Sequence, residues 1–94
     1  MAVFDLGETV ICSIEVRDEN NALQDPATSM EIKIDKTAPN YENIIAARVM
    51  INDSTGKYHY DYNSSSAEGG TYAAIYVATD GSRITIEKHP FQLQ

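Results

Sequence analysis

The sequence predicts an all-β protein, and three observations support this class. Apolar and polar residues alternate with a period of two in several segments. Turn sequences rich in Asp, Asn, Ser and Gly separate these segments at regular intervals. No segment carries a convincing long helical pattern. About seven short strands with regular turns predict a sandwich of two antiparallel sheets, formed by a single domain that spans residues 1–94.

The first two predicted strands are residues 10–17 and 30–35, with a turn at residues 18–21. In residues 10–17 the apolar positions alternate with polar ones, so Cys12 is expected to point inward. In residues 30–35 three apolar residues alternate with charged ones, which is a cleaner signal of the same kind. Residues 36–43 contain Pro39 and predict a loop that crosses between the sheets.

Residues 44–52 are predicted to form a strand, although their first four residues are also compatible with a turn or two of helix. Residues 53–56 form a turn sequence, and a four-residue loop there pairs this strand with residues 57–62. In that register Ile51 lies opposite Tyr58, and Val49 lies opposite Tyr60. The face that carries Tyr58, Tyr60 and Tyr62 is then expected to lie in the core.

Residues 72–79 and 82–88 carry the clearest pairing signal, because Asp80-Gly81 lies between them. A two-residue loop at this position puts Val77 opposite Ile84 and Ile75 opposite Ile86. These four branched side chains predict the buried face of the hairpin. The other face would then point outward; it carries Tyr72, Ala74, Tyr76, Ala78, Arg83, Thr85 and Glu87. A longer loop would bury Tyr72 and Tyr76 instead, with a packing role like that of a tyrosine corner.

The remaining segments are a serine-rich and glycine-rich loop and the C-terminal end. Residues 63–70 are expected to be a mobile loop. His89-Pro90 is expected to interrupt the last strand, which resumes at Phe91 and Leu93.

Composition and charge exclude several classes of function. Seven basic residues against 14 acidic ones give a formal net charge of −7, with the acids dispersed along the chain. Such a surface repels phosphate backbones and anionic lipid, so we expect no nucleic-acid or membrane partner. The single cysteine excludes an internal disulfide, and the first residues show no signal peptide. These features predict a protein that matures inside a cell, unless the chain is a fragment of a larger one.

No group of residues predicts catalysis, a metal or a cofactor. His59 and His89 lack the spacing of a metal pair. Asp18, Asn20 and Asp25 could in principle hold calcium, but the EF-hand pattern is absent and turns are rich in Asp and Asn. None of the serines lies in a nucleophile-elbow sequence. We therefore expect no enzyme.

The chain resembles immunoglobulin-like sandwich domains of the bacterial and viral type, and the match covers nearly all of it. The segments that carry the likeness are residues 7–10, 16–18, 25–26, 55–60, 70–72, 78–81 and 91–93. The chain differs from antibody domains because it lacks the two disulfide cysteines and the tryptophan. The resemblance implies an immunoglobulin-like fold and a non-catalytic role as a spacer, surface module, adhesin or virion accessory part.

The predicted interaction surface is the outward face of the 72–88 hairpin. Tyrosines beside small alanines form a flat amphipathic patch, and tyrosine is enriched in protein interfaces. The residues expected in the interface are Tyr72, Tyr76, Arg83 and Thr85. Carbohydrate could stack on the same patch, although the absence of tryptophan favours a protein partner.

The function expected from these observations is that of a structural or interaction module that docks on a larger assembly. The resemblance to small structural proteins of tailed phages implies a virion accessory protein of the head, neck or tail, present in the virion and in the host cytoplasm during assembly. Capsid or tail proteins, or a second copy of the chain, are the expected partners. The alternative is a module of a bacterial or archaeal cell-surface adhesin or carbohydrate-active protein, which the sequons at Asn52 and Asn63 permit.

Overall fold

The computed structural model describes residues 2–94, which form eight β-strands in two sheets with no helix. In these residues there is accordingly no helix of the length and apolarity needed to span a membrane. The strands are β1 (Ala2–Phe4), β2 (Thr9–Glu15), β3 (Ser29–Ala38), β4 (Glu42–Val49), β5 (Ile51–Ser54), β6 (Lys57–Asn63), β7 (Gly70–Asp80) and β8 (Arg83–Leu93).

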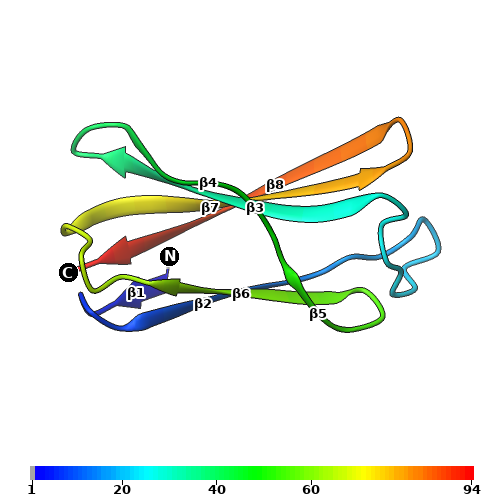
Figure 1. Ribbon diagram of the computed structural model, residues 1–94, viewed down its shortest axis with the longest axis horizontal. Coiled ribbons are helices and arrows are strands. Elements are labelled where there is room, and N and C mark those ends of the chain that lie inside the picture. The colour runs from blue at the N-terminus through cyan, green and yellow to red at the C-terminus, as the bar shows by residue number, and fades with distance from the viewer. Residues whose placement is uncertain (1) are drawn as a thin grey trace.

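The two sheets pack face to face, which confirms the predicted all-β sandwich (Figure 1). The large sheet has the strand order β1-β8-β7-β3-β4, and the small sheet has the order β2-β6-β5. All neighbouring strands run antiparallel except β1 and β8, which run parallel over three residues each. The turn between β7 and β8 lies away from the small sheet, on the side of the molecule opposite the two termini (Figure 1).

One core fills the space between the sheets, and it consists of the alternate residues on their inner faces. The Tyr72 ring stacks on Phe91 with its centroid 5.5 Å away, and its hydroxyl donates a hydrogen bond of 2.6 Å to the carbonyl oxygen of Glu68. The buried apolar residues of this core are Val10, Cys12, Met30, Ile32, Ile34, Met50, Tyr58, Tyr62, Tyr72, Ala74, Tyr76, Phe91 and Leu93.

The predictions for β2 and β3 are confirmed. Cys12 is a free, buried thiol on the inner face of β2. Met30, Ile32 and Ile34 are buried on the inner face of β3. Tyr58 and Tyr62 are also buried and Tyr60 packs partly against the core, so the inward face predicted for residues 57–62 is correct.

The predicted partner of residues 44–52 is wrong, although the segment is strand. The chain changes sheets at the buried residue Met50, so β4 pairs with β3 and β5 pairs with β6. Val49 therefore lies opposite Glu31, and Ile51 lies opposite His59. The crossing predicted at residues 36–43 does not occur, since β3 and β4 are neighbours in one sheet. Alternation cannot distinguish one long strand from two short strands in different sheets.

The predicted hairpin of residues 72–88 forms, but its loop and its buried face differ from the prediction. The loop is Gly81-Ser82, because Asp80 pairs with Arg83. Gly81 has a φ of +64° and occupies the first loop position, where a type II′ turn requires glycine. Val77 lies opposite Ile86 rather than Ile84, which is a shift of two residues. Such a shift leaves each side chain on the same face as its predicted neighbours.

The face that was expected to be buried is largely exposed, and of its four branched residues only Ile75 is buried. Ile84 and Ile86 are 64% and 58% exposed, whereas Tyr72 and Tyr76 are 1% and 3% exposed. The reason is that β8 continues through His89-Pro90 without interruption, so Phe91 lies opposite Tyr72. The tyrosine face then also carries Phe91 and Leu93, and these large side chains gain more from burial than the isoleucine face would.

Candidate interaction surface

The distal arm, defined as residues 77–87 at the β7–β8 turn, is the candidate functional region of the molecule. Its inner face looks onto a cleft, its outer face is apolar, and β8 forms its edge. It is built by the regular pairing of β7 with β8, which continues without a shift from Gly70 and Leu93 to Asp80 and Arg83. The arm is therefore a regularly paired ribbon rather than a loop.

The outer apolar face lies on the solvent side of the large sheet. Val49, Val77 and Ile86 fall in one row across the sheet, because Glu31 pairs with both Val49 and Val77, and Val77 pairs with Ile86. Val49 is 74% exposed, and the adjacent Ile84 and Ile86 are more than half exposed. We define this face as Val49, Val77, Ile84 and Ile86; Val77 is half-buried, and the neighbouring Ile75 lies on the same side of the sheet but is buried. A contiguous group of exposed branched residues marks an interaction site more often than scattered ones do.

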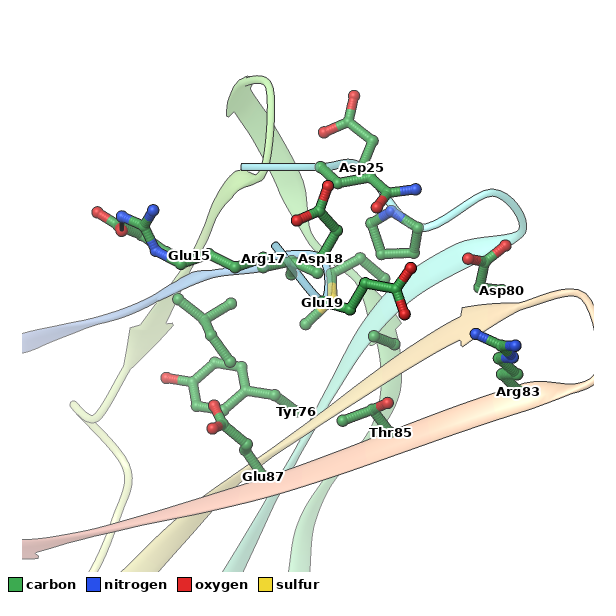
Figure 2. A pocket seen from close by; sticks show the side chains of 16 residues that line it. Glu15, Arg17, Asp18, Glu19, Asp25, Tyr76, Asp80, Arg83, Thr85 and Glu87 are labelled. Carbon is green, nitrogen blue, oxygen red and sulfur yellow. Dashed lines mark hydrogen bonds and ion pairs between the residues drawn. The ribbon is translucent and has the colours of Figure 1, made fainter. Parts of the chain in front are cut away.

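The inner face of the arm borders a cleft of about 660 Å³ between β7–β8 and residues 14–26 (Figure 2). Tyr76, Thr85 and Glu87 point from β7 and β8 toward the cleft, and the β2–β3 connection lies across from them (Figure 2). The floor is partly apolar; it includes Ile14, Val16, Met30, Tyr76 and Ala78.

The rim of the cleft is strongly acidic. It carries two guanidinium groups, those of Arg17 and Arg83, and six carboxylates, namely Glu15, Asp18, Glu19, Asp25, Asp80 and Glu87. Arg17 pairs with Glu15 at 2.7 Å, whereas Arg83 makes no ion pair within residues 2–94. The formal charge of the rim, two positive against six negative, is therefore −4. A cationic ligand is the chemistry that such a rim attracts.

Two of these carboxylates have structural roles. Asp18 accepts hydrogen bonds from the backbone of Asn20 and Ala22, which fixes the turn at residues 18–22. Asp25 accepts a hydrogen bond of 2.7 Å from the backbone of Gly56. The Asp18 and Asp25 carboxylates thus stabilise turns. No three His, Cys, Asp or Glu side chains converge as a metal site anywhere in residues 2–94.

The predicted interface residues separate into two groups. Tyr76, Arg83 and Thr85 come together at the cleft, whereas Tyr72 lines a smaller cleft of about 220 Å³ elsewhere. The prediction that Tyr72 and Tyr76 project outward is wrong, because both rings are buried between the sheets. Arg83 and Thr85 are exposed, and their place in an interface stays a prediction.

Burial also changes the acid–base chemistry of Tyr76 on the cleft floor and of Cys12 in the core. It raises the pKa of the Cys12 thiol to about 11 and raises the pKa of Tyr76, whose neighbours Cys12 and Glu87 add to the effect. Both groups are therefore neutral at physiological pH.

A serine, a histidine and an aspartate meet on the outer face of the small sheet. Ser13 lies opposite His59, whose Nδ1 is 2.8 Å from the Asp53 carboxylate. Among the described residues no hydrogen bond joins Ser13 to His59, and none of the three residues lines either cleft described above. The geometry thus lacks the contact that would activate the serine as a nucleophile.

Comparison with known proteins found no matching family model, no matching curated protein and no matching solved structure.

Sequence reasoning did not identify the acidic wall that residues 15–25 contribute to the cleft. These residues are more than 50 positions away from β8 in the chain, and nothing in their local pattern indicates that they face it. The outer apolar face did have a signal, because Ile75, Val77, Ile84 and Ile86 were grouped correctly on one face.

Proposed function

We propose that this protein is a non-catalytic binding module that docks on a partner through the distal arm. The observation that carries the proposal is the exposure of Ile84 and Ile86 beside Val77, on a ribbon in which β7 and β8 pair with each other without a break. Large exposed apolar groups on a strand at a sheet edge are an aggregation hazard unless a partner covers them.

We further propose that the module is immunoglobulin-like. In that fold one sheet places its strands in the order B-E-D, and the other holds C, F and G. The orders β2-β6-β5 and β8-β7-β3 support this assignment when β2 is taken as strand B and β7 as strand F. The hydrogen bond from the Tyr72 hydroxyl to Glu68 at the start of β7 supports it as well, since it has the form of a tyrosine corner.

The positions of the missing disulfide fit the same assignment. In antibody domains a cystine joins strands B and F, with the second cysteine two residues after the corner tyrosine. Cys12 lies on β2, and the position two residues after Tyr72 holds Ala74; both are buried. The core of this module is instead filled by the tyrosines and by Phe91.

The resemblance to small phage proteins extends the proposal to a virion accessory role, in which a capsid or tail protein is the partner. The cell-surface alternative shares the binding role but would use the sequons. Asn52 is poorly suited to carry a glycan, because its side-chain nitrogen donates a hydrogen bond of 2.9 Å to the carbonyl oxygen of Ser54.

The test compares two isoleucines of equal exposure on opposite sheets. Ile84 is 64% exposed on the large sheet, and Ile11 is 63% exposed on the small sheet. Ile84→Ser and Ile86→Ser are each expected to abolish association with the proposed capsid or tail partner, whereas Ile11→Ser leaves this association intact. Quantitative co-purification and sedimentation measure the association. The proposal fails if all three variants associate as well as the natural chain.

A further inference from the structure

The outer edge of β8 is open along most of its length. On this side β8 is paired only with β1, and only over Phe91–Leu93. Within residues 2–94 no strand pairs with this edge between Arg83 and Pro90. Eight consecutive residues of β8 therefore have no neighbouring strand on their outer side. Such an edge can accept an additional strand.

The phase of the backbone along this edge follows from two observations. Next to β1, the amide of Gln94 donates to Phe4 and its carbonyl accepts from Leu6, so the backbone of residue 94 points to the outer side. Pro90 agrees with this orientation. It has no backbone N–H, and at position 90 that group would point to the outer side, where no strand would accept its hydrogen bond. Alternation then aims the N–H and C=O groups of Ile84, Ile86 and Lys88 at the open edge, while Thr85 and Glu87 bond to β7.

The two faces of the arm dictate what the side chains of an added strand must be. One alternate row would lie beside Thr85 and Glu87 over the acidic cleft, whose rim carries six carboxylates and two guanidinium groups. That row is complemented by Lys or Arg. The other row would lie beside Ile84 and Ile86 on the outer apolar face, where branched aliphatic side chains pair best.

Charge also argues against the other occupants. The chain carries a formal net charge of −7, so a second copy would bring a further −7 to an edge that already borders an acidic cleft. The backbone of a nucleic acid is repelled for the same reason.

We infer that the distal arm binds an extended segment of a partner protein by strand addition to β8, and that this segment alternates basic and aliphatic residues. The inference rests on the proposed function and specifies its partner. Basic side chains enter the cleft, aliphatic side chains extend the outer apolar face, and the main chain bonds to Ile84, Ile86 and Lys88.

The test uses three synthetic eight-residue peptides with blocked ends. The first repeats Lys-Val four times, the second repeats Glu-Val four times, and the third places four Lys before four Val. The amides of the ¹⁵N-labelled protein are followed by NMR during titration and by hydrogen exchange in the bound state. The Lys-Val peptide is expected to slow exchange at Ile84, Ile86 and Lys88 at least about tenfold, with little change at Thr85 and Glu87.

Two matched variants test the backbone contact. Ile86→Pro removes an outward N–H and is expected to weaken binding of the Lys-Val peptide at least about tenfold, whereas Ile86→Val keeps both the N–H and a branched aliphatic side chain and retains most of the affinity. Circular dichroism checks that both variants fold. Glu19→Gln with Glu87→Gln is expected to weaken binding several-fold, more at low salt than at high salt.

Four results would overturn the inference. They are equal binding of the Glu-Val or block peptide, equal binding by the two Ile86 variants, no protection of the outward amides, and protection of those amides by the protein alone as its concentration rises. The last result would identify a second copy as the occupant. If the peptides fail while Ile84→Ser and Ile86→Ser still abolish association, strand addition alone is rejected. If those substitutions leave association intact, the proposed function itself fails.

Discussion

The two halves of the β7–β8 hairpin have the same strands and the same pairing, yet their large apolar side chains differ in burial and lie on opposite faces. In the half near the chain termini, Tyr72 and Phe91 are 1% and 4% exposed and stack on each other. In the distal arm, Ile84 and Ile86 are more than half exposed. The reason is that the small sheet covers only the inner face of the ribbon. The large apolar side chains of the distal arm lie on the outer face, which the small sheet does not cover.

The largest effect is expected where the ribbon is covered. Tyr72→Ala removes a buried ring and the hydrogen bond to Glu68, and should lower the free energy of unfolding by about 3–5 kcal/mol. Urea unfolding followed by circular dichroism measures it. Tyr72→Phe removes only the hydroxyl and should cost about 1 kcal/mol. Equal losses for the two variants would mean that the hydrogen bond, and not the ring, stabilises this half.

The next effect compares two turn glycines that both have positive φ. A Cβ on Gly56 would lie 2.7 Å from the carbonyl oxygen of Val16 and 2.8 Å from the amide of Gln24, whereas a Cβ on Gly81 would meet open space. Gly56→Ala should therefore cost about 2–4 kcal/mol, and Gly81→Ala about 1–2 kcal/mol from backbone strain alone. Thermal unfolding of the two variants measures the difference, and a reversed order would show that the β7–β8 turn is the tighter one.

A pH dependence is expected from the covered half. Burial raises the pKa of Cys12 from 9.0 to about 11, so the unfolded chain loses this proton at a lower pH than the folded chain. The thiol's contribution to stability is thus complete below pH 9 and is lost as the pH rises to about 11, a change of about 2–3 kcal/mol.

The control for this pH effect is Cys12→Ala, because the buried tyrosines also lose stability in alkali. The difference between natural chain and variant, taken from urea unfolding at pH 8 and pH 11, isolates the thiol. An unchanged difference across that range would mean that Cys12 is accessible to water in the folded protein.

The smallest effect is expected in the distal arm of the free protein. Ile86→Ala should change the free energy of unfolding by no more than about 0.5 kcal/mol, since the side chain is 58% exposed. A loss above 2 kcal/mol in monomeric protein would show that the isoleucine face is buried after all, as the alternation in the sequence first suggests.

The sequence was sufficient to locate most of the strands, but it was not sufficient to predict which strands pair with each other. Alternation identified β2, β3, β7 and β8, and it grouped Ile75, Val77, Ile84 and Ile86 on one face. It could not choose the buried face, because both faces of this hairpin carry large apolar side chains. Following the alternation through Pro90 to Phe91 and Leu93 would have favoured the tyrosine face.

Long-range neighbours were the part that local patterns could not supply. The change of sheet at Met50 and the approach of Glu15 and Glu19 to β8 depend on packing between distant segments. Of the cleft, only residues contributed by β7 and β8 were grouped in advance, namely Tyr76, Ala78, Arg83, Thr85 and Glu87. Tyr76 belongs to the floor of the cleft rather than to an outer surface.

The measurement that tests the central claim most directly is amide hydrogen exchange along β8 in the free protein. We predict an alternation: the amides of Ile84, Ile86 and Lys88 face the open edge and exchange at least about a hundredfold faster than those of Thr85 and Glu87, which bond to β7. Uniform protection of all five amides, independent of protein concentration, would contradict it, because the edge would then already be covered within the chain itself.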